Sequence, residues 1–292
     1  MRRFGDNLRA CLRWLILGWV VTLHAASEEA EVPVHSAHTD LTARGEAYFE
    51  VAVFVLTERP ETIKEDGLEF RILKQDVETD EIKPKMKRSR ATGFFLLHKD
   101  AYYFITARHV ARSMTPGTRL GFINARGDSR SFIFAKLVGS AERFTWIHHP
   151  KTDLSAMKLH IPEKGPGELS DVAMRTEDLY LAVPPRTSRL VVSGFPGGLG
   201  TRGGKISPIT AVVHLASDEI VLDADLDGIH VDTAYLVNPP AGKGFSGGPI
   251  FYELPDGSVK CTGILNGAWS DPTGGKFSIS VPARHILDLL PE

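Results

Sequence analysis

One serine lies in an unusually glycine-rich stretch of this chain. In residues 238–251, N-P-P-A-G-K-G-F-S-G-G-P-I-F, Ser246 directly precedes Gly247 and Gly248. Gly244 lies two positions before the serine. Glycines this closely spaced let the backbone turn sharply, so that its amides can converge beside the hydroxyl, as in an oxyanion hole. Because a serine hydroxyl is a weak nucleophile by itself, the rest of the chain must supply a base and a group that orients this base.

A histidine suited to act as the base follows an apolar, strand-like segment. Residues 103–111 read Y-F-I-T-A-R-H-V-A, so His109 lies just past the end of the expected strand. A side chain at such a position is held by a rigid element and can still reach a cleft. Taken alone, a histidine beside apolar residues is more typical of a packed or surface residue.

An aspartate suited to orient the histidine lies where a turn leads into a strand. In residues 149–159, H-P-K-T-D-L-S-A-M-K-L, Asp153 precedes an alternation of apolar residues that is typical of a half-buried strand. A partly buried carboxylate there can accept the imidazole N–H and fix the tautomer whose other nitrogen takes a proton from serine. Alone it would be a turn or cap residue, but the three side chains together form a coherent set for nucleophilic catalysis.

The motifs around these three residues resemble those of trypsin-like serine proteases of the chymotrypsin fold, nearer the exported bacterial branch than the animal digestive one. They are T-A-R-H-V at 106–110, K-T-D-L-S-A at 151–156 and G-F-S-G-G-P at 244–249. The likeness covers about residues 48–281. It implies an all-β fold of two six-stranded antiparallel β-barrels with the active-site cleft between them, and a serine endopeptidase that acts on protein or peptide substrates without a cofactor.

The same resemblance assigns further site residues. The catalytic triad would be His109, Asp153 and Ser246, and the amides of Gly244 and Ser246 would form the oxyanion hole. The strand at 262–267 would receive the substrate backbone as an added β-strand. None of the residues expected to line the side-chain pocket is acidic, so cleavage after Lys or Arg is not expected. The substrate-binding residues would be Pro240, Ala241, Lys243, Leu265, Asn266 and Gly267.

The elements that must position these residues are many short strands separated by Gly, Pro, Asn and Asp turns, which favours an all-β sandwich or barrel. A polar insertion at about 57–91, with a strand at 68–73, is expected to be a solvated face. A short C-terminal helix is expected at 282–290. The predicted strands are 48–56, 92–97, 101–106, 118–123, 131–138 and 154–161, followed by 190–193, 206–215, 219–222, 229–236, 249–253, 259–265 and 277–281.

The chain is predicted to begin with an export signal. Residues 1–26 combine four arginines, an apolar run at 14–23 and a small-residue end, which is the layout of a signal peptide. The apolar run is about half of the roughly 20 residues that span a bilayer, so no stable membrane span is expected after signal cleavage. We expect 27–45 to be a flexible lead-in, 46–165 an N-terminal β-barrel, 166–292 a C-terminal β-barrel with the terminal helix, and the protein to be periplasmic or secreted.

Net charge and cysteine content indicate which partners and disulfides to expect. The net charge of −2 becomes −5 without the first 26 residues, which carry four arginines and Asp6. A mildly acidic chain argues against a nucleic-acid partner. Cys11 lies in the signal and leaves Cys261 alone, so no intramolecular disulfide is expected, which suits a bacterial envelope protein. The sequence does not indicate an oligomeric state.

Three other readings remain open. The G-x-S-x-G string at 244–248 also matches an esterase elbow. That elbow needs a helix after the serine and a later Asp and His, and the only histidine after Ser246 is His285, in the predicted terminal helix. A catalytically silent, protease-like binding module would carry the same three residues. His148 and His149 are a possible metal pair, but adjacent side chains point apart on a strand and no third ligand lies at metal spacing, so no metal is predicted.

Overall fold

The computed structural model describes residues 45–65, 68–75, 81–161, 169–226 and 228–292, all of which belong to one compact unit of the chain. The predicted signal peptide and residues 27–44 of the predicted lead-in lie outside the described residues. Within these ranges, no helix has both the length and the apolar character needed to cross a membrane.

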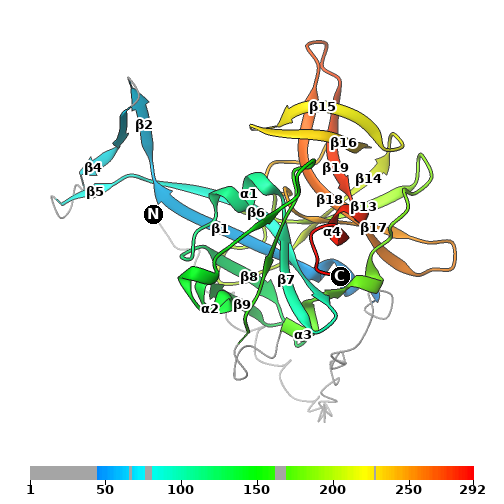
Figure 1. The fold of residues 1–292 in the computed structure, drawn as a ribbon, viewed down its shortest axis with the longest axis horizontal. Helices are drawn as coiled ribbons and strands as arrows, with labels where there is room; N and C mark the ends of the chain where they lie inside the picture. The colour runs from blue at the N-terminus through cyan, green and yellow to red at the C-terminus, as the bar shows by residue number, and fades with distance from the viewer. Residues whose placement is uncertain (1–44, 66–67, 76–80, 162–168, 227) are drawn as a thin grey trace, which may run out of the picture. The chain divides into compact units, whose positions relative to one another are not determined.

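The first sheet holds eight strands in the order β10-β11-β7-β6-β1-β8-β9, with β12 added to β6 (Figure 1). All neighbours are antiparallel except β12 and β6. β12 lies beyond residue 165, the predicted end of the N-terminal β-barrel, and it still pairs with this first sheet. The strands are β1 (Ala52–Pro60), β6 (Met86–His98), β7 (Ala101–Thr106), β8 (Arg119–Ile123), β9 (Ser129–Ile133), β10 (Ile147–His148), β11 (Ser155–Lys158) and β12 (Met174–Arg175).

The second sheet is fully antiparallel and runs β14-β13-β17-β18-β19-β16-β15. An additional pairing of β14 with β16 closes six of these strands into a ring, with β15 attached outside it. The all-β fold class predicted from the sequence is therefore confirmed. The strands are β13 (Arg189–Gly194), β14 (Ile209–Leu215), β15 (Ile220–Leu226), β16 (Ile229–Asn238), β17 (Pro249–Glu253), β18 (Val259–Ser270) and β19 (Lys276–Pro282).

The helices are short, and three predicted elements need correction. The predicted strand at 48–56 begins only at Ala52, because 45–51 form a 3₁₀ turn whose Tyr48 ring packs on Phe251 at 5.0 Å. The predicted strand at 131–138 ends at Ile133, since the buried Phe134 turns the chain into a helix. The terminal helix shortens to 284–287. The helices are η1 (Gly45–Val51), α1 (Arg108–Ser113), α2 (Ala135–Val138), η2 (Ala141–Arg143), α3 (Leu169–Val172), η3 (Thr176–Asp178), η4 (Pro196–Gly198) and α4 (Arg284–Leu287).

The predicted polar insertion is richer in strands than expected. β1 and β6 extend into it, with paired residues from Ala52 opposite Phe94 to Pro60 opposite Met86. Beyond them, β2 (Thr62–Glu65) pairs with β3 (Leu68–Arg71), and β4 (Leu73–Gln75) pairs with β5 (Ile82–Pro84). The strand predicted at 68–73 corresponds to β3 and the first residue of β4. We call residues 61–85 the arm (Figure 1); the side chains of β4 and β5 are exposed, as expected for a solvated face.

A layer of apolar side chains joins the two sheets. Successive residues of a strand point to opposite faces, so Phe95 enters the core of the first sheet, while Phe94 and Leu96 point away from it. On that second face they share a buried cluster with Phe251 and Ile264 of the second sheet. The central strands of the first sheet are therefore buried on both faces, which explains their unbroken apolar runs and holds the two sheets together.

Candidate active site

β7 and β11 bring His109 and Asp153 together. These neighbouring antiparallel strands place Thr106 opposite Ser155. His109 follows Thr106 by three residues and Asp153 precedes Ser155 by two, so both side chains emerge from the same end of the strand pair. α1 begins at once after β7 and buries Val110 in the core of the first sheet, which leaves His109 on the open side of the helix.

Asp153 holds His109 with both carboxylate oxygens. Its Oδ2 accepts the His109 Nδ1–H at 2.7 Å, and its Oδ1 accepts the His109 backbone N–H at 2.9 Å. The aspartate side chain is 1% exposed and the histidine 23%. A buried carboxylate is stable only when its oxygens are paired, and here one residue supplies both partners. This arrangement fixes the Nδ1–H tautomer and leaves Nε2 as the acceptor nitrogen.

The loop that carries Ser246 needs glycine at two positions. Gly244 and Gly247 have φ values of 104° and 84°, a region that side chains disfavour. A Cβ at Gly247 would also lie 2.2 Å from both Thr106 Oγ1 and Thr92 O, so the backbone passes too close to the first sheet for any side chain. The glycine-rich stretch thus has a structural reason as well as a chemical one.

Thr92 of β6 ties this loop to the first sheet. Its backbone N–H donates to the Ser246 carbonyl at 3.0 Å, and its hydroxyl donates to the Gly244 carbonyl at 2.7 Å. The same hydroxyl accepts the Phe195 N–H at 3.1 Å. The sequence analysis missed this residue, and the local signal is a polar side chain at the start of the otherwise apolar segment 92–97.

The two predicted oxyanion donors remain available. The carbonyls of Lys243 and Phe245 accept hydrogen bonds from the amides of Gly197 and Gly248, at 2.8 and 2.7 Å. In a trans peptide the N–H points opposite to its carbonyl, so these bonds turn the Gly244 amide away from Gly197 and the Ser246 amide away from Gly248. Among the described residues, neither the Gly244 nor the Ser246 amide donates to another backbone oxygen.

Asn266 lies between Ser246 and Asp153. Ser246 Oγ donates to the Asn266 carbonyl at 2.9 Å, and Asn266 Nδ2 donates to the Asp153 carbonyl. The pairing of β18 with β19 skips a residue between Leu265 and Gly267, so Asn266 is the extra residue of a bulge. A bulge re-aims its side chain out of the regular ladder, which explains how a strand residue reaches across to the other sheet.

The remaining predicted substrate-binding residues differ in accessibility. The side chains of Leu265 and Asn266 are buried, and Leu265 packs into the core of the second sheet. Any contact of a substrate with these two residues would therefore be through the main chain. Pro240 and Lys243 are exposed, whereas Ala241 is half-buried and its N–H donates to Ser278 Oγ at 2.8 Å. Gly267 is half-buried.

A second cluster of ionisable side chains lies beside the loop that carries Asp153. His149 Nε2 and His285 Nδ1 lie 3.3 and 3.1 Å from Asp288 Oδ2. His149 is 139 positions from Asp288, so spacing in the sequence could not reveal that the three residues meet. Burial lowers the pKa of both histidines, although hydrogen bonding to Asp288 opposes this effect. Burial opposes ionisation of Asp288, but its hydrogen bonds to the two histidines leave its pKa lowered.

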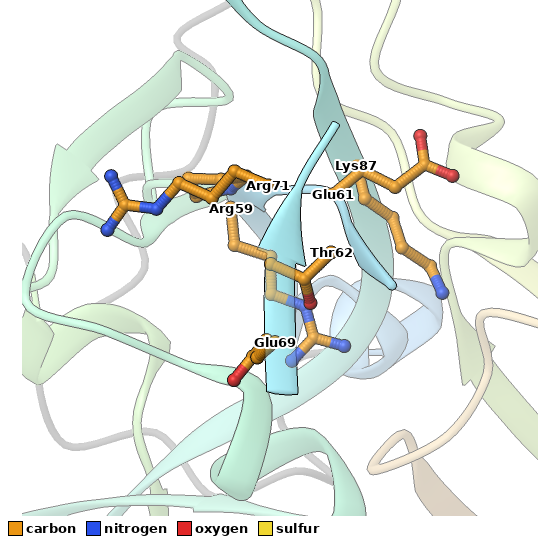
Figure 2. Close-up of a pocket in the computed structure, with 7 residues that line it drawn as sticks. Arg59, Glu61, Thr62, Glu69, Arg71 and Lys87 are labelled. Carbon is orange, nitrogen blue, oxygen red and sulfur yellow. The ribbon is translucent and has the colours of Figure 1, made fainter. Parts of the chain in front are cut away.

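A separate pocket of about 550 Å³ lies at the base of the arm. Figure 2 shows that the charged ends of its labelled side chains spread apart instead of converging on one point. It contains none of the predicted site residues, and nothing about it indicates a reaction. It is lined by Arg59, Pro60, Glu61, Thr62, Glu69, Arg71 and Lys87.

The solved structures that resemble this chain include two of low sequence identity. This chain resembles the MamO protease domain of Magnetospirillum magneticum (apo form), with a TM-score of 0.48 and 17% identity over 82% of this chain and 96% of that one. It also resembles Rv3671c of M. tuberculosis H37Rv, an inactive serine-to-alanine mutant, with a TM-score of 0.45 and 15% identity over 84% and 86%. No protein family and no curated protein matches the sequence. With TM-scores below 0.5, neither likeness bears on the chemistry of this chain.

Proposed function

We propose that this protein is a serine endopeptidase that hydrolyses peptide bonds through His109, Asp153 and Ser246. The observation that carries the proposal is the two-point contact of a buried carboxylate with one histidine, at 2.7 and 2.9 Å. A histidine held in this way offers Nε2 as a general base. The serine loop is anchored to the same region through Thr92 and Asn266.

In the proposed reaction, Ser246 Oγ attacks the carbonyl carbon of the substrate while its proton passes to His109 Nε2. Asp153 stabilises the imidazolium that forms. The amides of Gly244 and Ser246 donate to the oxyanion of the tetrahedral intermediate. The imidazolium then returns its proton to the leaving amine, the C–N bond breaks, and an acyl-enzyme remains. Water attacks this ester through the same base and restores the serine.

The second sheet offers an edge for the substrate backbone. Most of the strand predicted to receive the substrate, 262–267, already pairs with β17 and β19. Residues 267–270 of β18 pair with β19 on one side, and among the described residues no strand pairs with their other side. An extended peptide can add to such an edge through main-chain hydrogen bonds. The residues proposed to surround the substrate side chain carry no acid, so we propose a preference other than Lys or Arg. They are Pro240, Ala241 and Lys243.

One observation favours the silent binding module as the alternative. Ser246 Oγ donates to the Asn266 carbonyl at 2.9 Å. A hydroxyl has a single proton, so the serine must leave this bond before it can donate to His109. The proposal therefore includes this reorientation on substrate binding. The esterase alternative has less support, since a strand, β17, follows Ser246 where the esterase elbow needs a helix.

A fluorophosphonate probe tests the proposal directly. Such probes react with a serine that a base has activated, so wild-type protein should form a covalent adduct whose mass maps to Ser246. Ser246→Ala and heat-denatured wild type should form none. Folded wild-type protein that stays unlabelled would contradict the protease and favour the binding module.

Export also belongs to the proposal. The layout of residues 1–26 supports a protein that acts in the periplasm or outside the cell. Fractionation of cells that produce the full chain tests it, because a cleaved signal predicts a mature protein that begins near residue 27 and is found outside the cytoplasm. Retention of the intact chain in the cytoplasm would refute export without bearing on the chemistry.

A further inference from the structure

Two histidines and an aspartate that the proposed reaction does not use converge beside α4. His149 comes from the loop before β11, while His285 and Asp288 come from α4 and the residue after it. One potential ligand atom from each of the three lies within 4.8 Å of the other two. The two imidazole rings meet edge to face with their centres 5.0 Å apart.

We propose that His149, His285 and Asp288 bind a divalent transition metal ion of the zinc class. Two imidazoles and one carboxylate form a donor set that zinc commonly takes in proteins, with a water in the fourth position. Bonds of about 2.0–2.1 Å in a tetrahedron place neighbouring ligand atoms about 3.3 Å apart. Asp288 Oδ2 lies 3.3 Å from His149 Nε2 and 3.1 Å from His285 Nδ1, so two of the three ligand–ligand distances already match this spacing.

An outer carboxylate orients one of the ligands. Glu219 Oε1 lies 3.5 Å from His285 Nε2, the nitrogen that faces away from Asp288. Metal-binding histidines commonly donate their second N–H to a carboxylate, which fixes the tautomer and the ring orientation. Glu219 is itself paired with Arg284. Glu219 is therefore placed to accept the His285 Nε2–H once Nδ1 binds a metal.

Access to the cluster is open on the side of Asp288. Its side chain is 58% exposed, whereas that of His149 is 5% exposed. An ion can thus enter past the carboxylate, and a water can complete its coordination. The buried imidazole forms the closed side of the site.

Binding requires the ring proton to move on each of the two histidines. The His285 Nδ1–H donates to Asp288 in the free protein, so metal binding at Nδ1 moves that proton to Nε2, where Glu219 accepts it. The Lys151 N–H donates to His149 Nδ1 at 3.2 Å, so the free protein carries the ring proton on Nε2. When the metal takes Nε2, the ring proton moves to Nδ1 through solvent and the long hydrogen bond from Lys151 is lost. The net charge of neither imidazole changes, and the hydrogen bonds of the two histidines to Asp288 are replaced by coordinate bonds.

The metal would join α4 to the loop that carries the proposed catalytic aspartate. His149 precedes Asp153 by four residues, and Asp288 directly follows the last residue of α4. Cross-linking these two segments should stabilise the folded chain, because the unfolded chain does not bring the ligands together. Metal binding does not involve Ser246, so this proposal does not depend on whether the protein is a protease.

The test uses the full chain, treated with a chelator, with Zn²⁺ as the only probe. Equilibrium dialysis should find one Zn²⁺ per chain, with a rise in the thermal unfolding midpoint. His285→Gln and Asp288→Asn should each weaken binding by at least about tenfold. Asp288 is exposed and His285 is less buried than His149, so the variants are expected to fold, and circular dichroism checks this.

His230→Gln is the matched control, because His230 is an exposed histidine that lies within 3.6 Å of three aspartates. It should bind Zn²⁺ as the wild type does, and so should Ser246→Ala. The proposal is overturned if wild-type protein binds no Zn²⁺, if neither variant at α4 weakens binding, or if His230→Gln abolishes it.

Discussion

Two histidine–aspartate pairs each have one member in the loop before β11, and the two pairs differ in which partner is buried. In the pair His109–Asp153 the carboxylate is 1% exposed and the imidazole 23%, while in the pair His149–Asp288 the imidazole is 5% exposed and the carboxylate 58%. The buried partner is the one whose orientation is fixed, and the exposed partner is the one that can meet another molecule. Burial therefore distinguishes a base directed at a substrate from a carboxylate open to an ion.

The largest loss of activity should come from Ser246, whose proton the pair His109–Asp153 is proposed to accept. Ser246→Ala removes the nucleophile and should lower peptide hydrolysis by about 10⁴- to 10⁶-fold, leaving the fold intact. Turnover of a denatured protein substrate measures the loss, and circular dichroism checks the fold. Activity near the wild-type level would show that another residue is the nucleophile.

The aspartates of the two pairs can be exchanged for asparagine one at a time. Asp153→Asn should lower turnover by about 10⁴-fold, because the amide favours the wrong histidine tautomer. Asp288→Asn touches no reacting atom and should have a far smaller effect on turnover. Rates measured on the same peptide substrate decide this, and equal losses in the two variants would remove the distinction between the pairs.

Thr92→Val tests how firmly the serine is held beside the first pair. The substitution leaves the Gly244 carbonyl and the Phe195 N–H without their partner, which should cost about 2–4 kcal/mol of unfolding free energy. A displaced loop should also lower turnover by up to about 100-fold. Denaturant unfolding and steady-state rates measure the two effects.

Thr57→Val is the control for this variant, because it removes a buried hydroxyl of β1 that hydrogen-bonds to the Thr118 hydroxyl at 3.1 Å, away from the serine loop. It should lower stability without a matching loss of turnover. If both variants lose turnover to the same degree, the loss reflects general destabilisation and not the anchoring of the loop.

The smallest expected effect is the pH dependence that the cluster of His149, His285 and Asp288 gives to the stability of the folded chain. Burial lowers the pKa of His149 and His285, so the folded chain binds protons less readily than the unfolded chain does. Their contribution to stability is complete above about pH 6.5 and falls as the pH drops below that value. The pKa of Asp288 is also lowered, which adds to the loss at more acidic pH. The charged groups that face this cluster are Lys151, Glu219 and Arg284.

Thermal unfolding of metal-free protein between pH 5 and pH 8 measures this dependence. The unfolding midpoint should fall by a few degrees in acid, and the fall should be smaller in His285→Gln because one titrating imidazole is absent. A midpoint that rises in acid would contradict the sign of these pKa shifts.

The sequence indicated more about the first pair than about the second. His109 and Asp153 lie at the ends of neighbouring strands, so their strand-end motifs were enough to suggest that they meet. The contacts of His149 with Asp288 and of Thr92 with Gly244 depend on how the two sheets pack, which no local pattern encodes. Long-range packing therefore set the limit of prediction.

Packing also explains which elements were predicted well. β7 and β17 have the expected ends, and a turn directly precedes β7 at 99–100 and lies just before β17 at 246–247. The segments at 48–56 and 131–138 have equally apolar sequences, yet part of each is helical. In both segments a large ring, Tyr48 or Phe134, reaches an apolar cluster from a turn instead of a strand. Apolar composition alone does not distinguish these two ways of being buried.

The arm has a consequence for solubility. β4 and β5 pair only with each other among the described residues, and they expose the apolar side chains of Leu73 and Ile82. Such an edge is a template for pairing with a second copy of the chain. Lys74 and Lys83 stand directly opposite each other across the two strands. Lys83 pairs with Glu81, which limits the repulsion between the lysines, and these charged side chains lie where another identical strand would have to dock.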